Sequence, residues 1–150
     1  MANKNKAMKR YCDSAQETEK LLQYWRRFGG LVFTEFNTTH GYGGKMRRLD
    51  AIRFPELESR VHKTADRYEE IRELVGKHAV ELIEVHNWGF YGFGQLVGKA
   101  EIFRKYWSPK NMKLIFIVMG AHEFDPVTNP DPLTEDVFRK YGIEIFVPKN

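Results

Sequence analysis

Several features that mark particular protein classes are missing from this chain. It has a single cysteine, Cys12, so no disulfide can form within it. No stretch approaches the roughly 18 apolar residues of a membrane-spanning helix, and the first ten residues lack the apolar centre of a secretory signal. We therefore expect a soluble protein of the reducing cytoplasm with no membrane partner.

The chain also has little excess charge once its first residues are set aside. The net charge is +4, and the first ten residues hold four basic side chains and no acid. We expect residues 1–13 to be a flexible basic tail and residues 14–150 to form one domain, because 150 residues is an ordinary size for a single domain. The net charge supports a nucleic-acid partner only weakly, since a solvated tail explains it equally well.

Hydrophobic periodicity and turn residues predict an α/β fold. Ser14 and Glu17 have the capping-box pattern before a first helix, and Gly29 follows its end. The predicted helices span residues 14–28, 94–107 and 134–141, and the predicted strands span residues 31–36, 46–54, 79–88, 113–119 and 143–147. Residues 55–77 are charged with apolar positions at helical spacing, which predicts a helical insertion projecting from the sheet. The order predicts a mixed β-sheet flanked by helices.

Two acids stand out because they interrupt predicted strands that are otherwise apolar or alternating. Asp50 lies in the second strand and Glu84 in the central strand. A buried unpaired carboxylate costs several kcal/mol, so each acid needs a partner. One solution is a divalent metal such as Mg²⁺, which prefers oxygen ligands. The other is a salt bridge to a nearby arginine, and three are available at positions 47, 48 and 53.

These residues resemble the motifs of the PD-(D/E)xK nuclease superfamily, which includes restriction enzymes, archaeal Holliday-junction resolvases and RecB-type nuclease domains. The order of predicted elements is similar over about residues 14 to 120. The matching positions are Glu19 or Glu17 on the first helix, Asp50, the run Glu84-Val85-His86, and the helical pair Gln95 and Lys99. Two positions depart from the family: His86 replaces its usual lysine and Lys99 replaces the tyrosine of its helix motif.

The resemblance implies a restriction-endonuclease-like fold and a metal-dependent nuclease that hydrolyses DNA. It implies that Mg²⁺ or Mn²⁺ is held by Asp50, Glu84 and the carbonyl of Val85, with Glu19 completing the shell. His86 would bind the metal, position a water or act as a base, and Lys99 would be the family's lysine displaced to the helix. The side chains expected to contact DNA are Lys45, Arg47, Arg48, Gln95 and Lys99.

Some features admit more than one interpretation. The aromatic residues 88, 90, 91 and 93 follow the central strand and either stack on bases or belong to the core. The glycines between His40 and Lys45 suggest a hairpin tip rather than a phosphate cradle. Alternatives to an active nuclease are a catalytically silent DNA-binding module, in which the inserted helix forms a homodimer, and a protein-interaction domain without a nucleic-acid role.

Overall fold

The computed structural model describes residues 9–120, 123–125 and 127–149. Four helices accompany the sheet: α1 (Ala15–Phe28), α2 (Tyr68–Lys77), α3 (Phe90–Trp107) and α4 (Pro132–Lys140). The strands are β1 (Leu31–Asn37), β2 (Arg48–Phe54), β3 (Arg60–Lys63), β4 (Val80–His86), β5 (Met112–Val118) and β6 (Ile143–Phe146). Within the described residues, no helix is both long enough and apolar enough to cross a membrane.

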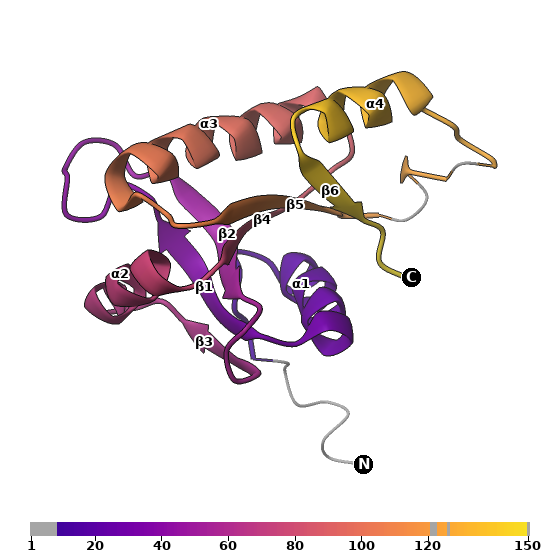
Figure 1. The fold of residues 1–150 in the computed structure, drawn as a ribbon. Helices are drawn as coiled ribbons and strands as arrows, with labels where there is room; N and C mark the ends of the chain where they lie inside the picture. The colour runs from indigo at the N-terminus through magenta and orange to yellow at the C-terminus, as the bar shows by residue number, and fades with distance from the viewer. Residues whose placement is uncertain (1–8, 121–122, 126, 150) are drawn as a thin grey trace, which may run out of the picture.

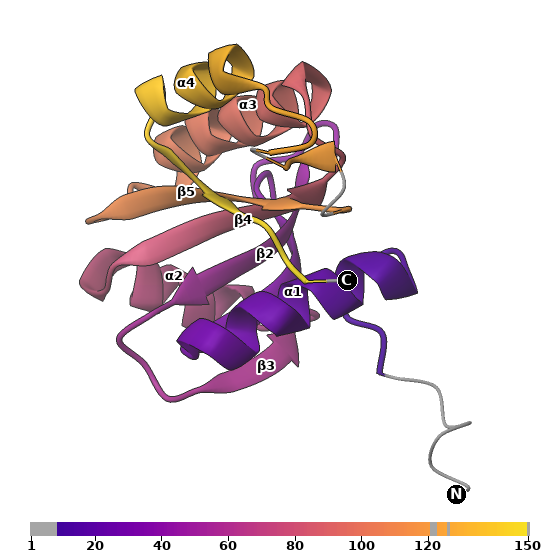
Figure 2. The same ribbon diagram turned by 90° about the vertical axis from the view of Figure 1, so that its right-hand side faces the viewer.

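The strands form one mixed sheet in the order β3-β1-β2-β4-β5-β6. β1 and β4 each run antiparallel to β2, whereas β3 runs parallel to β1, and β5 and β6 run parallel to β4. Helices α3 and α4 lie on one side of this sheet and α1 lies on the other (Figures 1 and 2). The predicted α/β class with a mixed sheet flanked by helices is therefore confirmed.

The two faces of the sheet bury separate apolar clusters. On one face, residues of α2, α3 and α4 pack with alternate residues of the strands, including Phe36, Leu82 and Phe116. On the other face, Leu21 and Tyr24 of α1 pack against the central strands. Because β4 and β5 are covered on both faces, nearly all of their side chains are buried, as their apolar composition predicts.

Helix α1 begins and ends as its sequence predicts. The Ser14 hydroxyl accepts a hydrogen bond from the backbone N–H of Glu17 at 3.0 Å, which caps the helix. Gly29 follows its last residue with φ 67°, and its N–H donates to the carbonyl of Trp25. Two residues of the expected tail are, however, held against this helix. The N–H groups of Tyr11 and Cys12 donate to Thr18, and Cys12 is buried, so the tail boundary at residue 13 is wrong.

The segment 55–77 is not a projecting helical insertion. Its first half contains strand β3, which extends the sheet edge beside β1, and only residues 68–77 are helical. In α2, Ile71 and Val75 are completely buried in the core shared with α3. The misprediction arose because Val61 fits a helical spacing with the later apolar residues. The charged, alternating sequence around Val61 also suits a short edge strand.

Candidate functional site

The candidate site begins where strand pairing breaks down around Asp50. The β1–β2 register passes from Thr34 opposite Ala51 to Phe36 opposite Leu49, and Glu35 between them has φ 54°. The pairing of β2 with β4 also ends at Ala51, opposite Ile83. Asp50 thus stands at a point where β2 separates from β4, and its side chain can enter the gap between the strands.

Asp50 and Glu84 meet at this separation. One carboxylate oxygen of Asp50, Oδ2, accepts a hydrogen bond of 2.8 Å from the backbone N–H of Val85 on β4. Glu84 is the residue one step beyond the last β2–β4 pair, and it is 4% exposed. The two acids therefore lie on neighbouring strands, close enough for the charge of Glu84 to raise the pKa of Asp50.

Lys99 supplies the positive charge of the site from helix α3. Its Nζ lies 3.1 Å from Oε1 of Glu84, and both side chains are largely buried. The predicted reach of Lys99 from the helix to the acidic pair is confirmed. The alternative in which arginines neutralise these acids is wrong for the described residues. Arg48 pairs with Asp13 and Glu35, and Arg53 pairs with Glu81. The guanidinium of Arg47 donates to the carbonyl of Met46.

The environment disfavours the charged form of both acids. Burial raises the pKa of Asp50 well above its usual range, and the negative charge of Glu84 raises it further. Burial also raises the pKa of Glu84, although the ammonium of Lys99 opposes the rise. One lysine thus faces two buried carboxylates, so the pair should bind an additional proton or cation.

Of the two acids predicted on α1, Glu17 and not Glu19 lies on the side of Asp50. Residues two apart on a helix point about 200° away from each other, and it is Glu17 whose charge raises the pKa of Asp50. Glu19 is exposed, and its nearest hydrogen-bond partner is Gln23 on the same helix. In the described part of the chain, no three His, Cys, Asp or Glu side chains gather as a metal-binding group.

His86 lies at the end of β4, on the side of the acidic pair. Its positive form lowers the pKa of Glu84, and its Nδ1 is 3.2 Å from the carbonyl oxygen of Asn87. The ring is partly exposed and lies 5.3 Å, centroid to centroid, from the ring of Tyr91. Gly92 makes room for it, since a Cβ there would come within 2.9 Å of the imidazole. His86 therefore flanks the acids without being one of a gathered ligand set.

Four of the five residues predicted to contact DNA line one hollow next to Lys99. The hollow has a volume of about 450 Å³ and is lined by Lys45, Arg47, Gly94, Gln95, Gly98, Lys99 and Ile102. Its charged walls come from the loop between β1 and β2 and from α3. Arg48 is absent from this lining, and its guanidinium binds acids instead.

The aromatic residues after β4 divide between core and surface. Trp88 and Phe93 pack on Phe138 of α4, with ring centroids 4.5 and 5.1 Å away. Phe90 and Tyr91 are 56% and 73% exposed, so only these two are available for stacking on a ligand. Phe90, at the first residue of α3, contacts Phe93 with ring centroids 6.0 Å apart but remains largely open to solvent.

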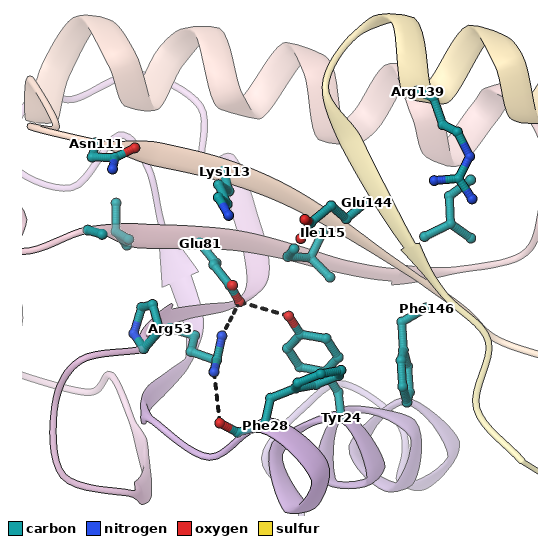
Figure 3. A pocket seen from close by; sticks show the side chains of 14 residues that line it. Tyr24, Phe28, Arg53, Glu81, Asn111, Lys113, Ile115, Arg139, Glu144 and Phe146 are labelled. Atoms are coloured by element: carbon teal, nitrogen blue, oxygen red, sulfur yellow. Dashed lines mark hydrogen bonds and ion pairs between the residues drawn. The ribbon is translucent and has the colours of Figure 1, made fainter.

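A second hollow, of about 620 Å³, lies between α1, the sheet and α4, and the sequence did not predict it. On its wall, Arg53 pairs with Glu81 at 2.6 Å and donates to the carbonyl of Phe28, while the Tyr24 hydroxyl donates to Glu81 (Figure 3). This network ties the end of α1 to β2 and β4. Glu81, like Glu84, could have been noticed as an acid in an apolar strand. Its partner Arg53 follows only from the β2–β4 register, which places the two residues opposite each other.

Comparisons of the chain with protein-family models, with curated proteins and with solved structures gave no match.

Proposed function

We propose that this protein is a metal-dependent nuclease that hydrolyses DNA phosphodiester bonds. The observation that carries the proposal is the meeting of Asp50 and Glu84 where β2 separates from β4, with Lys99 bound to Glu84 from α3. This combination of an Asp, a Glu on the next strand and a lysine resembles the motif set of the PD-(D/E)xK superfamily. The lysine comes from the helix instead of position 86.

The two acids fit a divalent cation such as Mg²⁺ or Mn²⁺. Carboxylates are the oxygen ligands that such ions prefer. Burial and then the negative charge of Glu84 raise the pKa of Asp50, and a bound cation would offset both effects. Asp50 and Glu84 would hold the ion, with the carbonyl of Val85 as a further ligand. When bound, the ion would lower the pKa of a coordinated water and neutralise charge on the phosphate.

The other residues of the site have roles that follow from their positions. Lys99 would exchange part of its contact with Glu84 for a phosphate oxygen and so stabilise the charge of the transition state. His86, beside Glu84, would orient the attacking water or accept its proton. Lys45, Arg47 and Gln95 would bind the DNA backbone, because they line the hollow next to Lys99.

A catalytically silent DNA-binding module is the second candidate. It is favoured by the contact of Lys99 with Glu84, which occupies one of the acids with a side chain of the protein itself. It is also favoured because, among the residues that the structure describes, no three acidic, histidine or cysteine side chains gather as a metal-binding group. Such a module would keep the basic hollow and bind DNA without cutting it.

Titration of Mg²⁺ and Mn²⁺ by calorimetry, together with cleavage of plasmid and branched DNA, tests the proposal. We expect the parent protein to cleave and Asp50→Asn to lose both metal binding and cleavage. Lys99→Ala should retain metal binding but cleave about 100-fold more slowly. Lys105→Ala is the matched control, because it removes the same charge from an exposed position on the same helix.

The opposite result would identify the silent module. If neither the parent protein nor His86→Lys cleaves any of these DNAs with either metal, while both still bind DNA, the nuclease proposal is wrong. If Lys99→Ala cleaves as fast as the parent, Lys99 is not the displaced lysine.

A further inference from the structure

We propose that the hollow beside Lys99 binds single-stranded DNA, with one base stacked on Tyr91 and the backbone lying across Gly94 and Gly98. This inference rests on the proposed function in one respect, because it names the substrate class of the same site. Three independent features support it. Tyr91 has an exposed aromatic ring. The floor of the hollow is formed by two glycines that packing does not explain, and its opposite wall is a basic loop held in place by contacts with α3.

Tyr91 is placed to present its ring to a base. It lies in the first turn of α3 and is 73% exposed. Gly94 and Gln95 follow one helical turn later on the same side, and Gly98 and Lys99 lie one turn beyond them. A ligand that touches Tyr91 and continues along this side of α3 therefore enters the hollow and approaches the lysine that contacts Glu84.

The two glycines of the floor have no explanation within the chain. Glycine is a poor helix former, yet both glycines lie well inside the 18-residue helix α3. A Cβ at Gly94 or Gly98 would meet no heavy atom within 4 Å, whereas a Cβ at Gly92 would clash with Phe116 and His86. Packing therefore accounts for Gly92 alone. A backbone passing close over the helix would account for Gly94 and Gly98.

The opposite wall of the hollow is the β1–β2 loop, which is attached to α3. The ring of Tyr42 stacks on the ring of Tyr106 with centroids 4.2 Å apart, and its hydroxyl donates to the Tyr106 carbonyl at 2.7 Å. Figure 1 shows the loop beside the last turns of α3. Lys45 and Arg47 are thus held across from Gln95 and Lys99, at a position to bind successive phosphates.

This combination fits a single strand better than a duplex. In a duplex each base is covered above and below by its neighbours, so an exposed tyrosine ring finds no free base to stack on. A single strand offers both its phosphates and its base faces, and proteins bind it with a basic groove and exposed aromatic rings. A volume of about 450 Å³ is also within the range of sites that enclose small ligands, which suits a few nucleotides.

Fluorescence anisotropy with the full chain in EDTA tests this inference without any cleavage. The probes are a labelled single strand of about 12 nucleotides, within the site sizes known for such proteins, and a duplex of the same length. We expect the single strand to bind at least about tenfold more tightly than the duplex, and Tyr91→Ala to lose about tenfold in affinity for it. Tyr141→Ala is the matched control, because Tyr141 is 57% exposed and lies after α4, outside the hollow.

A second variant separates binding from folding. In Gly98→Gln a better helix former occupies open space, so the variant should unfold at a higher temperature than the parent and still bind the single strand about tenfold less tightly. The inference is overturned if the duplex binds as tightly as the single strand, or if Tyr91→Ala and Gly98→Gln bind like the parent. Because no metal is present, its outcome is separate from that of the proposed nuclease, which fails only in the cleavage assay.

Discussion

Replacing Lys99 by methionine would remove the charge that faces Glu84 while keeping most of the length of the side chain. In the parent protein the Lys99 side chain is 14% exposed and the Glu84 side chain is 5% exposed, with 3.1 Å between Nζ and Oε1. Removing one partner of a buried ion pair costs roughly 3–5 kcal/mol, because the remaining charge is left uncompensated. Lys99→Met should therefore destabilise the fold strongly wherever Glu84 is ionised.

The size of the loss depends on pH, since Glu84 can take up a proton instead. Protonating a carboxyl group costs about 1.4 kcal/mol for each pH unit above its ordinary pKa, which is 4.5 for Glu84. Losing Lys99 cannot cost more than protonating Glu84 does. The cost of protonation is about 1 kcal/mol near pH 5 and about 5 kcal/mol near pH 8. Burial already raises the folded pKa of Glu84, and losing Lys99 raises it further. Stability is thus retained at low pH and lost as pH rises through the folded pKa.

Urea unfolding of the parent and the variant at the two pH values measures this difference. We expect a loss of about 3 kcal/mol or more near pH 8 and of about 1 kcal/mol or less near pH 5. The double variant Lys99→Met with Glu84→Gln should recover part of the loss at high pH. Arg104→Met is the control, because its pair with Glu101 is exposed on the same helix and contributes less than about 1 kcal/mol.

The reasoning is refuted by a loss that is equal at both pH values. Such a result would mean that Lys99 stabilises the fold through packing of its stem and not through Glu84. A loss no greater than that of Arg104→Met would show that the pair is open to water in solution.

Three further predictions concern other parts of the molecule. Because burial and Glu84 raise the folded pKa of Asp50, Asp50→Asn should raise the unfolding temperature near pH 8 and have little effect near pH 4; no gain at high pH would contradict the raised pKa. Ile71→Ala should lower the unfolding free energy measured in urea by about 2–5 kcal/mol, since Ile71 is completely buried. A loss below about 1 kcal/mol would indicate that α2 lies outside the core. Arg53→Met should cost about 3–5 kcal/mol by leaving Glu81 unpaired, and the same cost in a Glu81→Gln background would rule out the pair as its cause.

Much of the fold was predictable because the relevant signals are local. Cap residues and glycine located the ends of α1, and the buried strands β4 and β5 are recognisable as apolar runs. The prediction for residues 55–77 failed because helical and strand periodicities cannot be told apart over so few residues. Arg60 and the residues after it form strand β3 because they pair with β1, and β1 is remote from them in the sequence.

For the candidate site, the sequence by itself determined which residues are unusual. Asp50 and Glu84 stand out as acids in strands that burial should keep apolar. Lys99 stands out only as a departure from a helix motif that this sequence otherwise resembles. The tertiary structure decided their partners, because a carboxylate binds the cation that the strand register and helix packing bring near it. That is how Glu84 came to face Lys99 while Glu81, three residues earlier on the same strand, faces Arg53.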